Sequence, residues 1–136
     1  MLTQPTTDKI LLAIADDLNS VVLPSVTDEP AKVLLGQIDQ LLRRLSRRTG
    51  SEINWMIKEI KKINAAIGRD NTEFSSYLLT DIAAAYSEAS GALGDAIDQA
   101  FEEGDSEQID TLREVLVDRI AVEQEILGQL DLVGRG

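Results

Sequence analysis

The sequence predicts an all-α protein, an antiparallel bundle of four to five amphipathic helices, and three observations support this. Apolar residues recur at steps of three and four along nearly the whole chain, the spacing that places side chains on one face of a helix. Residues that start and stop helices separate these stretches. Aromatic residues make up only 4% of the 136 residues, so the core must be aliphatic, and no alternating pattern of usable length indicates a strand.

The first two stretches precede residue 51. The first is expected to end near Val22, because Pro24 cannot continue a helix interior. Thr27 then offers a capping hydroxyl, Pro30 suits a first turn, and Gly50 is expected to end the second helix in the left-handed conformation. The first apolar stripe comprises Ile10, Ile14, Leu18, Val21 and Val22, and the second comprises Ala31, Leu34, Ile38, Leu41, Leu42 and Leu45.

The third and fourth stretches form the middle of the chain. Ser51 is expected to cap the third helix and Gly68 to end it, and its stripe comprises Ile53, Met56, Ile60, Ile63 and Ile67. The fourth helix is expected to begin near Asn71 or Thr72, with Phe74, Leu78, Ile82, Ala85, Ala89, Leu93, Ala96 and Ala100 on its face. Gly91 and Gly94 each cost roughly 1 kcal/mol relative to Ala inside a helix, so the sequence leaves open whether this stretch is one helix, bent there, or two helices.

The last stretch follows Gly104, with Asp105 as the expected cap and Gln108 at capping-box spacing. Its stripe comprises Ile109, Leu112, Leu116, Ile120, Glu123, Leu127 and Leu130. Glu123, the polar interruption, is expected to lie at a helix end or to pair with a cation on a facing helix. Short links between stretches predict one helical-bundle domain over residues 1–136, with flexible ends at about 1–5 and 134–136.

Composition narrows the chemistry of the chain. It contains no cysteine and no histidine, which excludes a disulfide framework, a cysteine nucleophile, thiolate metal sites and a histidine-based diiron centre. The acidic residues of the last two stretches fall mainly on the polar faces, so we interpret them as solvated rather than as a carboxylate metal site. No calcium-loop, phosphate-loop or dinucleotide motif is present. We therefore expect no catalytic residue, no cofactor and no metal.

The net charge of −11 disfavours nucleic acid as a partner. The N-terminal stretch has no basic region, and its first apolar run is too short for a signal or membrane segment. We therefore expect no membrane association. Together with the lack of cysteine, this predicts a cytoplasmic protein.

A basic segment stands out within this acidic chain. Residues 43–62 hold seven basic side chains against two acidic ones, whereas residues 95–131 hold twelve acidic side chains against two basic ones. Neighbouring basic and acidic helices would complement each other; alternatively, the segment contacts a partner or an anion. Trp55 either anchors a partner or covers the edge of the bundle. The candidate contact residues are Arg43, Arg44, Arg47, Arg48, Trp55, Lys58, Lys61 and Lys62.

Two regions carry a family resemblance. Residues 14–24 followed by 31–48, and residues 96–104 followed by 112–122, are similar to the two ends of an uncharacterised family of small bacterial helical proteins. Genes of that family often accompany aminoglycoside-phosphotransferase-like kinases and acyl-CoA dehydrogenases. Residues 123–125, Glu-Gln-Glu, depart from the family's Ala-Asn-Pro ending. The resemblance implies a bacterial accessory protein that acts beside enzymes and carries over no catalytic residue.

These observations lead to two functional hypotheses. The first is a non-catalytic interaction or accessory protein that self-associates or docks on an enzyme. The second is a small-ligand-binding module, in which an apolar cleft along the Ala-rich fourth helix takes an acyl group and the basic stripe takes a phosphate. A homodimer is expected because several apolar residues lie at the edges of the main stripes or outside them and widen each apolar face: Val21, Val22, Leu35, Ile57, Val115, Val122, Ile126 and Leu132.

Overall fold

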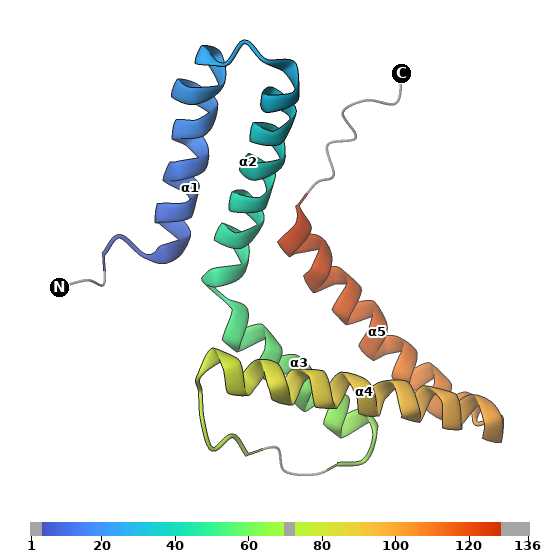
Figure 1. Cartoon of the computed structure of the whole chain (residues 1–136). Helices are drawn as coiled ribbons and strands as arrows, with labels where there is room; N and C mark the ends of the chain where they lie inside the picture. Colours follow the sequence, from blue (N-terminus) through green and yellow to red (C-terminus); the bar gives the residue numbers. More distant parts are fainter. Residues whose placement is uncertain (1–3, 70–72, 129–136) are drawn as a thin grey trace. The chain divides into compact units, whose positions relative to one another are not determined.

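The computed structural model describes residues 4–69 and 73–128 and confirms the all-α prediction. These residues form five α-helices and no strand (Figure 1). The helices are α1 (Thr7–Asp17), α2 (Glu29–Thr49), α3 (Glu52–Ala66), α4 (Leu79–Glu103) and α5 (Ser106–Leu127). In the described part of the chain, no helix is both long enough and apolar enough to cross a membrane.

The contacts divide the chain into two compact units. The first unit comprises Met1–Ser51 and Gln124–Gly136, and the second comprises Glu52–Glu123. The single domain expected over residues 1–136 stays a prediction. Of the two flexible ends expected, residues 1–3 and 134–136 lie outside the described residues.

The first unit is built on an antiparallel hairpin of α1 and α2 (Figure 1). The chain stays helical beyond α1 through a π-helical turn at Leu18–Val22 and a 3-10 turn at Leu23–Ser25, so the predicted end near Val22 is confirmed within one turn. Pro24 occupies the first turn of that 3-10 helix, where its missing N–H costs nothing.

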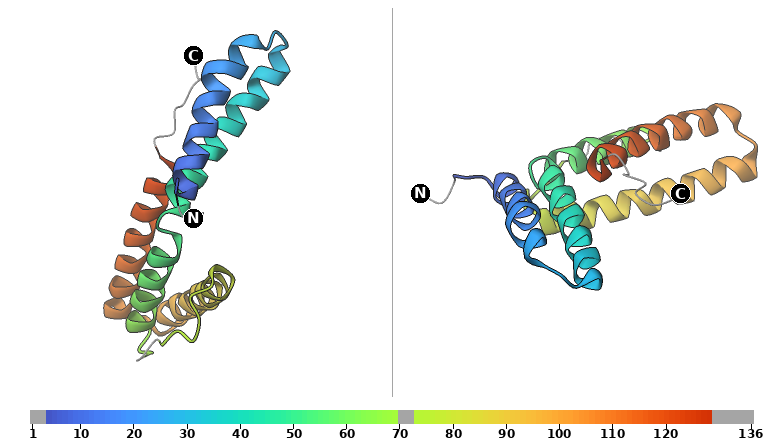
Figure 2. Two further views of the ribbon diagram at one scale, coloured as in Figure 1. Left: turned by 90° about the vertical axis from the view of Figure 1, so that its left-hand side faces the viewer. Right: turned by 90° about the horizontal axis from the view of Figure 1, so that it is seen from above.

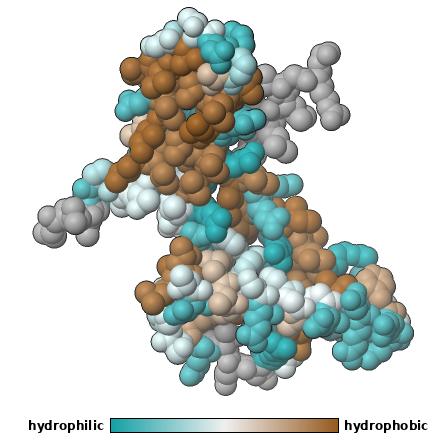
Figure 3. Space-filling view, viewed as in Figure 1, coloured by the Kyte–Doolittle hydropathy of each residue, from teal (hydrophilic) through white to brown (hydrophobic). Residues whose placement is uncertain are grey.

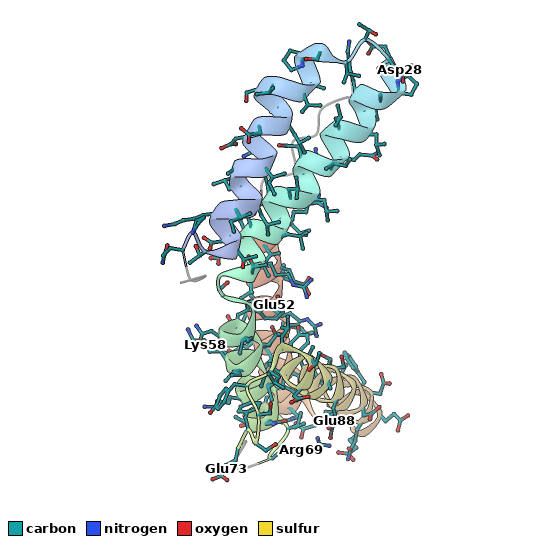
Figure 4. All side chains as sticks on the ribbon, turned by 60° about the vertical axis from the view of Figure 1, so that its left-hand side comes forward. Asp28, Glu52, Lys58, Arg69, Glu73 and Glu88 are labelled. Atoms are coloured by element: carbon teal, nitrogen blue, oxygen red, sulfur yellow. The ribbon has the colours of Figure 1, made fainter. Side chains whose placement is uncertain are left out.

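At both ends of α2 the capping differs from the sequence prediction. The cap is Asp28 rather than Thr27, because the Asp28 carboxylate accepts the Ala31 N–H at 3.0 Å (Figure 4 labels Asp28 at this helix start). The helix ends at Gly50 as predicted, but this glycine has φ −72°, an ordinary right-handed value. The left-handed conformation expected there was wrong, because α3 begins two residues later and the chain keeps its right-handed turn.

The second unit packs α3, α4 and α5 around one aliphatic core. Its buried members are Met56, Ile60 and Ile63 from α3, Ile82, Ala89, Leu93 and Ala100 from α4, and Leu112 and Val115 from α5. A short turn joins α4 to α5, and α5 returns from it in roughly the opposite direction, inclined to α4 (Figures 1 and 2). The predicted stripe of α3 is confirmed, since Ile53 and Ile67 also pack against this core.

The start of α4 differs from the prediction. Asn71 and Thr72 lie outside the described residues, and the helix begins only at Leu79. Phe74 and Leu78 therefore precede it. The hydroxyl of Ser76 accepts the N–H of Leu78, a local hydrogen bond that competes with helix formation in this stretch.

Helix α4 is continuous through Gly91 and Gly94, so the fourth stretch forms one helix rather than two. Neither glycine has an atom within 4 Å of where a Cβ would stand, so close packing does not demand them. Buried Ala89 and Leu93 flank them, and the packing of this face offsets the low helix propensity.

The start of α5 agrees with the prediction. Asp105 accepts the Gln108 N–H at 3.0 Å, and Gly104 before it adopts the left-handed conformation with φ +68°. The side chain of Gln108 does not complete a capping box, because its amide donates to the carbonyl of Ala66 on α3.

The predicted apolar stripe of α5 was wrong beyond Leu112. Leu116 and Ile120 are 36% and 53% exposed, whereas Val115, expected at the edge, is buried. The inward stripe runs instead through Leu112, Val115 and Arg119, because Arg119 meets a buried carboxylate on α3. The most regular apolar spacing is therefore not the one that faces the core.

Candidate functional site

A polar cluster interrupts the aliphatic core of the second unit. Glu59 on α3 is only 7% exposed and is contacted from both other helices. The Tyr86 hydroxyl on α4 donates to Glu59 Oε1 at 3.0 Å. The guanidinium of Arg119 on α5 lies 3.4 Å from the same oxygen. The Glu59 carboxylate thus links α3 to both α4 and α5.

Arg119 is the most connected side chain of this cluster. Its guanidinium lies 5.2 Å from the centroid of the Tyr86 ring, within cation–π range, and its Nη1 donates to the Ser90 hydroxyl at 3.4 Å. It also pairs with Glu123 one turn along α5, at 3.3 Å. Glu123 was expected at a helix end or opposite a cation on a facing helix. It pairs instead with a cation of its own helix.

The aromatic side chains close one side of the cluster. Trp55 packs edge-to-face on Tyr86, with ring centroids 5.3 Å apart and an interplanar angle of 87°. The Trp55 indole N–H is buried and has no hydrogen-bond partner in the structure. The geometry matches the second of the two roles expected for Trp55, because its ring packs against the core of the second unit.

Burial is the main cause of the shifted pKa values of Glu59 and Tyr86. Burial raises the pKa of Glu59 above its ordinary 4.5, and the hydrogen bond from Tyr86 and the charge of Arg119 offset this only in part. Burial also raises the pKa of Tyr86 to about 12, and the hydrogen bond to Glu59 adds to the shift. Tyr86 therefore remains a neutral donor at physiological pH.

The raised pKa of Glu59 predicts a specific pH dependence of stability. The folded chain binds the Glu59 proton more tightly than the unfolded chain does. Protonation of Glu59 therefore contributes to the free energy of unfolding near pH 4, and this contribution is lost as the pH rises through the pKa that Glu59 has in the folded chain. We expect Glu59→Gln to lose less unfolding free energy between about pH 4 and pH 8 than the parent chain does. Urea unfolding at both pH values measures this.

The matched control is Glu88→Gln, which changes an exposed carboxylate of α4 outside this cluster. It should keep the pH dependence of the parent chain. Equal pH dependence in the parent chain and in Glu59→Gln would contradict the prediction.

The eight candidate contact residues fall into both units. The four arginines belong to α2 in the first unit, and Trp55 and the three lysines belong to α3 in the second. Trp55, Lys58 and Lys62 line a small hollow of about 120 Å³ together with Glu59, Asp118 and Arg119. Lys61 is exposed and does not line it (Figure 4 labels Lys58 on α3).

Several of these cations already have structural roles. Lys62 pairs with Asp118 on α5. Arg43 donates to both carboxylate oxygens of Asp39 at 3.1 Å and to Asp16 at 2.9 Å, and these bonds raise its pKa. Within the first unit, Arg47 donates to the carbonyls of Ile126 and Leu127 at 2.9 and 2.8 Å, which satisfies the carboxyl end of a helix.

Sequence reasoning missed Glu59, Tyr86 and Arg119. The signal for Glu59 was its place between Met56 and Ile60, directly on the buried stripe of α3. The signal for Arg119 was its spacing of four from Val115, which becomes visible once Val115 rather than Leu116 is assigned to the core. Tyr86 carries no comparable signal, because an aromatic residue in an amphipathic helix is ordinarily part of a core.

Comparison with known proteins adds nothing to this geometry. Models of known families, curated proteins and solved structures yield no match to the chain. The family resemblance of its two end regions therefore stays a prediction. Within the cluster Glu59 and Glu123 both pair with Arg119, and in the described part of the chain no three acidic side chains gather where a metal ion would be held.

Proposed function

We propose that this chain is a non-catalytic interaction protein whose α1–α2 hairpin is its docking element. The observation that carries the proposal is the exposure of apolar side chains along both helices of that hairpin. In the described part of the first unit, Ala15 is the one buried side chain. Two helices that bury so little of their apolar surface normally pack against a further element.

The exposed side chains define the hairpin face, which comprises Ile10, Ile14, Val21, Leu34 and Leu41, each 44–63% exposed. Figure 3 shows apolar side chains gathered over α1 and α2. Contiguous apolar surface of this kind on a protein usually marks an interface. The family resemblance, which implies a bacterial accessory role beside enzymes, agrees with a docking function.

The second hypothesis, a small-ligand module, has less support. The expected acyl cleft along α4 corresponds to a hollow of about 140 Å³ lined by Ile97, Phe101, Ile109, Leu112, Arg113 and Leu116. Pockets for small ligands typically measure roughly 300–1,000 Å³. The basic residues that were to bind phosphate include Arg43 and Lys62, which already pair with carboxylates.

Site-specific photocrosslinking tests the proposed function. We expect a photoreactive residue at position 14 to crosslink to one discrete protein, a second copy included, in cells that produce the chain. The matched control is position 12, because Leu12 is also exposed but lies about 160° around α1 from Ile14. Leu41→Glu should abolish the product at position 14. Equal products at both positions, or none at either, would contradict a docking role for the hairpin face.

A further inference from the structure

The hairpin face has a geometry that suggests its occupant. Ile10 and Ile14 are four apart and lie within about 40° of each other around α1, and Val21 follows in the π-helical turn Leu18–Val22. Leu34 and Leu41 are seven apart and lie within about 20° on α2. Both stripes point away from the α1–α2 seam to the same side of the hairpin, where Figure 3 shows a continuous apolar surface.

The opposite side of the hairpin is polar and already connected. Arg43 of α2 bonds Asp16 of α1 across the seam and Asp39 on its own helix. The amide of Asn19 donates to Asp39 at 3.0 Å. The polar side chains on this side thus hydrogen-bond to one another. The hairpin is therefore amphipathic, with a polar side that suits solvent and an apolar side that suits an apolar partner.

The charges of the hairpin are balanced overall but separated along its length. Residues 7–50 contain six acidic and six basic side chains, although the whole chain has a net charge of −11. The half nearer the turn, residues 13–39, carries five acidic side chains and one basic, a net charge of −4. The open half, residues 7–12 and 40–50, carries one acidic side chain and five basic, a net charge of +4.

We propose that the hairpin face binds the same face of a second copy turned end for end, so that two hairpins form a four-helix bundle. In this arrangement the acidic half of each copy lies against the basic half of the other. Without Asp16, Asp39 and Arg43, which pair with one another within each copy, the two halves still carry net charges of −2 and +3. The arrangement with both turns at the same end would oppose like charges. A two-fold axis makes one self-complementary patch sufficient, and four antiparallel helices bury the stripes that two leave exposed. This inference rests on the proposed function and names its partner.

Sedimentation equilibrium of the full chain tests the association. We expect a mass of twice 14.9 kDa at tens of micromolar. Ile14→Glu should raise the dissociation constant at least about 30-fold, as for a central interface residue. Leu12→Glu, on the polar side, should change it by less than about threefold. A helical circular dichroism spectrum for both variants shows that they fold.

Disulfide trapping tests the arrangement, independently of whether Ile14→Glu folds. The chain has no cysteine, so each introduced thiol is unique. We expect Thr27→Cys mixed with Gly50→Cys to give mainly the mixed disulfide, because the turn of one copy meets the open end of the other. Faster formation of the Thr27→Cys homodimer would overturn the end-for-end arrangement.

The experiments distinguish a failure of the proposed dimer from a failure of the docking function. A monomer that still crosslinks to a different protein from position 14 would overturn the second copy as occupant and leave the docking function intact. A monomer without position-specific crosslinks would overturn both.

Discussion

Truncating Ile63 to alanine is expected to cost about 2–5 kcal/mol of unfolding free energy. Ile63 is 0% exposed and lies in the aliphatic core of the second unit, between helices that cannot close over the lost volume without shifting. The cost combines lost transfer free energy with the cavity that remains. Urea unfolding followed by far-UV circular dichroism measures it. The same size of effect is expected for Ile60→Ala, since Ile60 is 2% exposed.

Leu116→Ala is the matched control for this prediction. The regular spacing of α5 predicts Leu116 as a core residue and thus a cost as large as for Ile60. The structure places it at 36% exposure, so we now expect a cost below about 1 kcal/mol. A loss of 2 kcal/mol or more at Leu116, or of less than about 0.5 kcal/mol at Ile63, would contradict the assignment of the core.

Replacing Arg119 by methionine is expected to cost about 2–3 kcal/mol. The change leaves the Glu59 carboxylate buried without its positive neighbour, and it removes the cation over the Tyr86 ring. Loss of one partner from a buried pair costs about 3–5 kcal/mol, and the 26% exposure of Arg119 places the expected value lower. Arg113→Met is the control, because Arg113 is 70% exposed and pairs with Asp110, three residues away on the same helix, so its loss should cost less than about 0.5 kcal/mol.

A double-mutant cycle separates charge from packing in this prediction. In the Glu59→Gln background, Arg119→Met should cost at least about 1 kcal/mol less than in the parent chain, because no charge is left unpaired. Equal costs in the two backgrounds would mean that Arg119 acts through its aliphatic stem rather than through Glu59.

The sequence is sufficient to predict what is local in this fold. Helix boundaries marked by Pro24 and Asp105 are confirmed to within a turn, because these residues act through their own backbone or side chain. Helix α2 also ends at Gly50, although this glycine keeps a right-handed φ. Which face of a helix is buried depends on residues elsewhere in the chain. On α5 two apolar stripes compete, and the one that contains Val115 and Arg119 is favoured by a carboxylate on another helix. Spacing within one helix carries no information about that partner.

The same reasoning explains the candidate site. The basic residues between Arg43 and Lys62 form one cluster in the sequence, yet Arg43 pairs along and across its own hairpin and Lys62 pairs with α5. Charge density along a chain does not indicate which charges are neutralised after folding. The cluster of Glu59, Tyr86 and Arg119 is assembled from three helices, and its members are separated by 27 and 33 residues of chain.

The packing of Trp55 on Tyr86 gives the second unit an optical signature of its own. All five aromatic residues of the chain lie between residues 55 and 101, so the residues of the first unit contribute none. Trp55 fluorescence and near-ultraviolet dichroism therefore report on α3–α5, whereas the peptide signal sums all five helices. A denaturation curve recorded at both wavelengths resolves the melting of the hairpin from that of its neighbour, without a label or a truncated chain.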